Sequence, residues 1–137
     1  MNISELNDWL LSENQQPLII GILNVTPDSF TDGGKFLDSN TAVNHAMDMI
    51  ADGADIIDIG GESTRPGSDP VSAELQIQRV VPVISAIREQ LSDSIPISID
   101  TTLSAVAEAA IEAGATVIND ISGGLQDQLI LTVAAKR

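Results

Sequence analysis

The stretch that decides the fold is residues 54–67, ADIIDIGGESTRPG. Its first part, Ala54 to Ile59, is a mostly apolar run of the kind typical of a buried parallel strand. Gly60 and Gly61 then let the backbone turn tightly where the strand ends. A hydroxyl, a fixed cation and a rigid proline follow at Thr64, Arg65 and Pro66. Parallel sheets bind ligands at the carboxyl ends of their strands, so this polar loop indicates a site for a small anionic molecule.

Three further mostly apolar runs predict strands on either side of this one, over residues 18–24, 95–100 and 115–119. Between and after the strands, apolar residues recur at helical spacing. They predict helices over residues 41–52, 72–91, 101–113 and 126–137. Residues 1–17 are predicted to be a polar leader with a short helical piece. Alternating strands and helices with right-handed crossovers predict an α/β protein with a parallel sheet.

Four such βα units are half of a TIM (β/α)8 barrel, which typically needs about 250 residues. The chain has 137 residues. We therefore expect residues 1–137 to be a single partial domain, the first half of a TIM barrel that this chain alone does not close. The last predicted helix runs to Lys136 and Arg137 without a stop signal, so we expect a fragment or a truncated product.

Composition narrows the possible partners and the location. The formal net charge of −14 disfavours nucleic acid and anionic membranes as partners. The absence of cysteine excludes disulfides and zinc–thiolate sites and favours a cytoplasmic location. The first 34 residues contain no Lys or Arg, so neither a signal peptide nor a transit peptide is expected. Because the chain has only six basic residues, a phosphorylated ligand would need Arg65, helix N-termini or a divalent cation.

Polar residues follow every predicted strand at its carboxyl end. They are Asn24, the segment from Gly60 to Arg65, Asp100, and the pair Asn119 and Asp120. One such residue most often only caps the next helix, but four strand ends on one face of a parallel sheet favour a shared site. Two of the connections, residues 25–40 and 60–71, exceed the roughly two to six residues that are common in such loops, which is typical of binding loops.

Four motifs resemble the dihydropteroate synthase family in their order and spacing. They are GILNVTPDSFTDGG at 21–34, GGESTRPG at 60–67, SIDT at 98–101 and IND at 118–120. The resemblance implies a transferase of folate biosynthesis and a target of sulfonamides. Its reaction would condense a dihydropterin methyl diphosphate with 4-aminobenzoate, giving 7,8-dihydropteroate and diphosphate.

The resemblance also implies a role for each matching residue. Asn24 would help to hold Mg²⁺, directly or through water, against the diphosphate. The implied catalytic residues are Asp32, which would join the metal or order the first loop, and Arg65, which with Thr64 would contact the diphosphate. The pterin would be held by Asp100 and Asn119, and the aminobenzoate site would be lined by Phe30 and Pro66.

The later half of the family supplies a further Asp, a Lys and an Arg-x-His group that this chain does not contain. We therefore expect the chain to be inactive alone. Full-length members are expected to be homodimers, and the fragment could self-associate to cover its open sheet edges. Two other functions stay open, namely a pterin-binding domain of a corrinoid-linked methyltransferase and a non-catalytic, self-associating half barrel.

Three further polar residues are assigned supporting or surface positions. Asp58, within the second predicted strand, is expected to face the barrel interior and to be satisfied by a neighbour. Glu62 is expected to support Arg65 or the strand end. His45, the single histidine, is expected on a helix surface rather than as a catalytic base.

Overall fold

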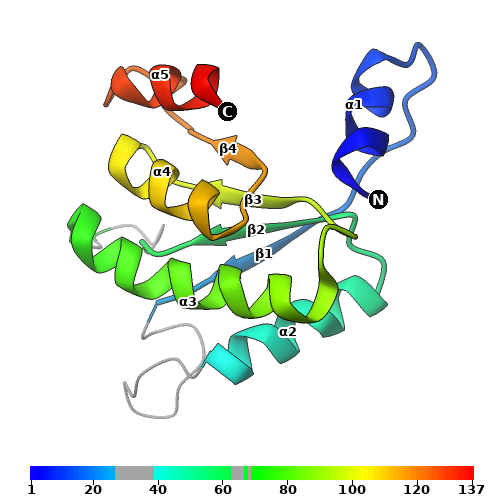
Figure 1. Cartoon of the computed structure of the whole chain (residues 1–137), viewed down its shortest axis with the longest axis horizontal. Helices are drawn as coiled ribbons and strands as arrows, with labels where there is room; N and C mark the ends of the chain where they lie inside the picture. The colour runs from blue at the N-terminus through cyan, green and yellow to red at the C-terminus, as the bar shows by residue number, and fades with distance from the viewer. Residues whose placement is uncertain (27–38, 63–66, 68) are drawn as a thin grey trace.

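The sheet contains four parallel strands in the order of the sequence, β1-β2-β3-β4 (Figure 1). The structure is a computed structural model that describes residues 1–26, 39–62, 67 and 69–137. The strands are β1 Ile20–Asn24, β2 Ile56–Gly60, β3 Ile97–Asp100 and β4 Val117–Asn119. Adjacent strands pair in parallel throughout. The predicted α/β fold with parallel βα units is confirmed, and the barrel is not closed by this chain.

A helix follows each strand and one precedes the sheet. Their bounds are α1 Ile3–Leu11, α2 Ser39–Ala51, α3 Ala73–Leu91, α4 Ser104–Ala113 and α5 Leu129–Lys136. Figure 1 shows α2, α3 and α4 along one side of the sheet, and no helix of the described residues covers the opposite side. Among the described helices, none has both the length and the apolar character that crossing a bilayer requires.

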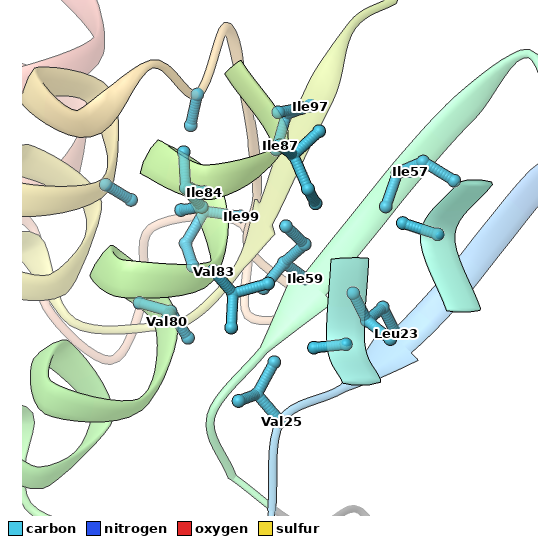
Figure 2. Packing of buried hydrophobic residues seen from close by; sticks show 14 of the residues in the cluster. Leu23, Val25, Ile57, Ile59, Val80, Val83, Ile84, Ile87, Ile97 and Ile99 are labelled. Atoms are coloured by element: carbon cyan, nitrogen blue, oxygen red, sulfur yellow. The ribbon is translucent and has the colours of Figure 1, made fainter. Parts of the chain in front are cut away.

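The core lies between the sheet and these helices. Alternate strand residues point toward the helices, as the period of two in a strand requires. Five of them, Leu23, Ile57, Ile59, Ile97 and Ile99, have no exposed surface. Figure 2 shows Ile59, Ile97 and Ile99 near side chains of α3, and Leu23 and Ile57 beside α2; the wider cluster adds residues of α4. The α3 residues labelled there are Val80, Val83, Ile84 and Ile87.

The other face of the same strands is open. Ile20 and Ile22 of β1 are 53% and 61% exposed, although both are large and apolar. Asn24 and Asp100 are partly exposed on this side, and Asn119 is exposed. In a complete barrel this face would be the interior, so the four strands form about half of a barrel wall.

Hydrogen bonds from Arg88 of α3 link this helix to the segments that enter β3 and β4. The Nε atom of Arg88 donates to the carbonyl of Gly114 at 2.8 Å, and its Nη1 donates to the carbonyls of Ser92 and Ile95 at 2.8 and 2.7 Å. Gly114 has a φ of +124°, and a Cβ there would lie 2.6 Å from Cγ of Arg88. A glycine is therefore needed both for the backbone conformation and for the close approach. Burial lowers the pKa of Arg88, an effect that Asp93 opposes.

Candidate functional site

The strand register aligns three of the predicted site residues in one row. Asn24 pairs with Gly60, Gly60 with Asp100, and Asp100 with Asn119. All four positions are the last residues of their strands, and the side chains of Asn24, Asp100 and Asn119 belong to the open face. A Cβ placed on Gly60 would lie 3.5 Å from Oδ2 of Asp100, so this carboxylate extends over the bare backbone of β2. The predicted meeting of polar strand ends on one face is confirmed for Asn24, Asp100 and Asn119.

A second row lies one layer nearer the amino ends. There Ile22 pairs with Asp58, Asp58 with Ser98, and Ser98 with Val117. Asp58 is only 6% exposed. The Nδ2 atom of Asn119 donates to Oδ1 and Oδ2 of Asp58 at 3.4 and 3.3 Å. Asp58 therefore faces the predicted barrel interior and has a neighbour as its partner, as expected.

The carboxyl ends of the strands carry a concentration of negative charge. Burial raises the pKa of Asp100, and repulsion by Asp58, Glu62 and Asp120 raises it further. Within the described part of the chain, the two ion pairs join Met1 to Glu5 and Glu112 to Arg137, so neither neutralises these acids. The open face thus offers acceptors to a ligand that carries hydrogen-bond donors or to a cation.

Asp120 has a structural role in the turn after β4. Its carboxylate accepts from the backbone N–H and hydroxyl of Ser122 and from the N–H of Gly124, each at 2.8 Å. Desolvation acts to raise the pKa of Asp120, but these hydrogen bonds outweigh it and hold the pKa below its usual range.

The helix α5 begins at residue 129, three residues later than the predicted 126. The turn at Asp120 precedes it, and so does Asp127, which accepts from the N–H groups of Ser104 and Leu129.

A buried amide that the sequence analysis missed anchors the connection after β2. Gln76 of α3 is 1% exposed. Its Nε2 donates to the carbonyl of Val71 at 3.0 Å and to Glu62 at 3.5 Å, and its Oε1 accepts from the hydroxyl of Thr101 at 3.3 Å. Glu62 also accepts from the N–H of Val71 at 3.2 Å. Glu62 therefore holds the end of β2 through hydrogen bonds to Val71 and Gln76. Gln76 in turn joins Glu62 to Thr101, the residue after Asp100.

Helical spacing could have revealed Gln76. It lies four residues before Val80, in the stripe that continues with Val83, Ile84 and Ile87. Leu75, the apolar neighbour of Gln76, is 39% exposed, so the inward position is taken by the amide and not by the apolar residue. Gly61 explains part of the difference, since a Cβ there would lie 3.1 Å from the backbone of Gln76. The chain after β2 therefore passes α3 at Gln76 so closely that a side chain at position 61 would crowd the helix.

The remaining predicted site residues, Phe30, Asp32, Thr64, Arg65 and Pro66, lie outside the described residues. The described residues directly after β1 and at the end of β2 lie next to each other. The N–H of Val25, directly after β1, donates to the carbonyl of Gly60 at 2.7 Å. His45 is exposed on α2, as expected.

A separate hollow of about 410 Å³ lies near the start of β4 rather than at its carboxyl end. Its lining is mostly apolar and carries one cation, Arg137. The residues that line it come from α1, α4, α5 and the start of β4, and they are Ile3, Ile111, Ala115, Thr116, Ile118, Ala134 and Arg137. It contains none of the carboxylates or amides gathered on the open face.

Comparison with known proteins places this arrangement in a family. Residues 20–137 match the family described as pterin binding enzyme. The chain is 59% identical over 122 residues to dihydropteroate synthase of Clostridium beijerinckii, covering 89% of this chain and 45% of that protein. The chain therefore spans a little under half the length of that curated relative.

Two solved structures extend the likeness to three dimensions. Dihydropteroate synthase from Clostridium difficile, solved in the presence of pteroic acid, has a TM-score of 0.81 at 50% identity and covers 87% of this chain and 44% of its own. The Xanthomonas albilineans enzyme with 4-aminobenzoic acid has a TM-score of 0.79 at 44% identity, covering 88% and 43%. The chain belongs to the pterin binding enzyme family.

Proposed function

We propose that this chain is the amino-terminal part of a dihydropteroate synthase, which joins a dihydropterin methyl diphosphate to 4-aminobenzoate. The observation that carries the proposal is the row formed by Asn24, Gly60, Asp100 and Asn119 on one open face of the sheet. Relatives solved with pteroic acid and with 4-aminobenzoic acid support this choice of substrates.

The pterin would be held by Asp100 and Asn119. An ionised carboxylate only accepts hydrogen bonds, so Asp100 suits the paired N–H groups on the edge of a pterin ring. A carboxyl whose pKa is raised by burial and by neighbouring acids gains from such donors, because they stabilise its charged form. The amide of Asn119 would offer the same edge its oxygen as an acceptor and, beside the N–H that faces Asp58, its other N–H as a donor.

Mg²⁺ is proposed as the ion that accompanies the diphosphate, with Asn24 as a ligand directly or through water. The described residues contain no group of three or more His, Cys, Asp or Glu that could hold a metal by themselves. This fits Mg²⁺, which keeps several waters and takes only one or two protein ligands together with substrate phosphates. Asp32 would join the metal or order the first loop. When bound, the ion would neutralise charge on the leaving diphosphate.

The proposed reaction needs no protein nucleophile. The bond between the methylene carbon and the diphosphate oxygen breaks with its electron pair going to the diphosphate, and the electron-rich pterin stabilises the cationic carbon. The amine of 4-aminobenzoate then forms the carbon–nitrogen bond and loses a proton to water. The protein contributes position and charge stabilisation, with Thr64 and Arg65 at the diphosphate and Phe30 and Pro66 at the aminobenzoate.

A chimera tests this proposal. In it, the chain replaces the matched region of the Clostridium beijerinckii enzyme, and incorporation of labelled 4-aminobenzoate into dihydropteroate is measured. We expect product from the chimera, none from the chain alone, and none when Asp100→Asn and Asn119→Ala are combined. Asn44→Ala, an exposed position on α2, is the matched control and should leave turnover unchanged.

The outcomes separate the alternatives. A chimera that folds, as judged by circular dichroism, but yields no labelled dihydropteroate contradicts the proposal. A corrinoid-linked methyltransferase would instead transfer a methyl group and leave the aminobenzoate unchanged. Self-association of the chain stays a prediction, which sedimentation at several concentrations tests. A monomer at every concentration would remove it.

A further inference from the structure

Asp58 is a buried carboxylate in an unusual position. It lies in the middle of β2 on the open face, is 6% exposed, and has no Lys or Arg paired with it in the described part of the chain. Burying a charge is costly unless it is compensated. Ser98, its direct neighbour on β3, is also buried, so this row accepts a small uncharged residue. Packing alone therefore does not call for a carboxylate at position 58.

The partner of Asp58 is not on a neighbouring strand. Asn119 is the last residue of β4, and β3 separates β4 from β2. In a flat sheet these two strands would lie about 10 Å apart. The hydrogen bonds of 3.3 and 3.4 Å nevertheless join the two side chains across β3, which fits the concave curvature of a barrel wall.

The chemistry of this contact fixes the orientation of the amide. A carboxylate can only accept, so the nitrogen of the Asn119 amide has to face Asp58. The oxygen of the amide and its second N–H are then directed away from Asp58. A neutral partner such as Asn or Ser can also donate, and it would permit either orientation of the Asn119 amide.

We propose that Asp58 is a positioning residue of the pterin site, which holds the Asn119 amide in the one orientation that presents its oxygen to the pterin edge. The inference rests on the proposed function, because Asn119 is assigned to the pterin there. Asp58 acts through Asn119 and needs no contact with the reacting atoms. The charge of Asp58 also faces Asp100, alongside Glu62 after β2 and Asp120 after β4.

The first test is made on this chain by NMR and needs no activity. Asp58→Asn keeps the size of the side chain and removes the requirement that its partner donate. We expect the two side-chain N–H resonances of Asn119 to shift and to exchange faster with solvent. Asp55→Asn is the matched control, because it removes one charge from the segment entering β2, where Asp55 accepts from the N–H of Ile19 at 2.9 Å. It should leave the Asn119 resonances unchanged.

The second test measures kinetics in the chimera. Loss of one oriented hydrogen-bond partner should raise KM for the pterin diphosphate roughly five- to tenfold in Asp58→Asn. KM for 4-aminobenzoate and kcat should change less than twofold, a split that a general loss of structure would not produce. Asp58→Ser introduces the residue type already found at Ser98 in the same row. It should reproduce the effect, and it guards against poor folding of the first variant.

The results distinguish this inference from the proposed function. Unchanged Asn119 resonances in Asp58→Asn and Asp58→Ser overturn the positioning role whether or not the chimera is active. An active chimera whose pterin KM does not respond to either variant also overturns it, while leaving the proposed function intact. An inactive wild-type chimera counts against the proposed function, and the NMR measurement still tests whether Asp58 holds the amide of Asn119.

Discussion

The two faces of the sheet differ sharply although they belong to the same four strands. On the helix-covered face, the strand residues Ile57, Ile59, Ile97 and Ile99 have no exposed surface. On the open face, one residue along in each strand, Ile22 is 61% exposed and acidic or amide side chains gather. The covered face contributes stability through apolar burial, whereas the open face carries groups that the fold alone does not require.

The largest expected effect compares two isoleucines on the two faces. Ile59→Ala should lower the free energy of unfolding by about 3–4 kcal/mol, because it removes buried methyl groups and leaves a cavity. Ile22→Ala should lower it by less than about 1 kcal/mol, because its side chain is already largely in water. Urea denaturation of both variants measures the difference, and equal losses would contradict the distinction between the faces.

Arg88 lies on α3, on the helix-covered side of the sheet, and shows how much a polar side chain contributes to stability there. Arg88→Ala should lower the free energy of unfolding by about 2–3 kcal/mol, because it removes donors from the carbonyls of Ser92, Ile95 and Gly114. Arg79→Ala breaks the hydrogen bond from Nη1 to the carbonyl of Gly61 at 2.9 Å, and should cost about 1 kcal/mol. Thermal and urea unfolding of the pair check the order, and a larger loss in Arg79→Ala would reverse it.

Replacing Asp100 on the open face should raise the free energy of unfolding, whereas the substitutions above lower it, and the change should be smaller. Its pKa in the folded state is raised above the usual value of 3.8. The unfolded chain therefore loses its proton first as the pH rises, and stability falls between the unfolded and folded pKa values. At neutral pH the charge of Asp100 opposes folding. Asp100→Asn should accordingly stabilise the chain at pH 7, with a gain that disappears below about pH 3.5.

Asp127 provides the contrast for this measurement. Hydrogen bonds from Ser104 lower the pKa of Asp127, so its contribution to stability is present above the unfolded pKa and is lost as the pH falls through the lowered one. Asp127→Asn should therefore destabilise the chain at pH 7. Urea midpoints at pH 7 and about pH 3.5 for both variants give the two signs, and the same sign at pH 7 would contradict the assignment.

The covered face could largely be predicted from the sequence, because apolar periodicity reports which side of a strand or helix is buried. The strand order and the row of Asn24, Asp100 and Asn119 follow from βα alternation and the rule that parallel strands end on one face. Apolar periodicity alone passes over Gln76, since a buried amide carries no apolar signal, although its position in the stripe of Val80, Val83 and Ile84 places it on the inward face of α3. Periodicity also could not pair Asp58 with Asn119, which are 61 residues apart and meet only through curvature across β3.

The start of α5 shows a second limit. The sequence pattern predicts a helix from residue 126, yet the helix begins at Leu129 because Asp120 and Asp127 organise turns before it. Local hydrogen bonds of aspartate with nearby backbone N–H groups compete with helix formation in this way. The predicted roles of Phe30, Asp32, Thr64, Arg65 and Pro66 stay predictions.

The most direct test of the central claim is an NMR titration of the isotope-labelled chain with pteroic acid, which detects even millimolar binding. We expect resonance shifts concentrated on the side chains of Asp100 and Asn119 and lost when Asp100→Asn and Asn119→Ala are combined. Shifts confined to the hollow lined by Ile3, Ile111 and Arg137, or shifts that persist in the combined variant, would contradict a pterin site on the open face of the sheet.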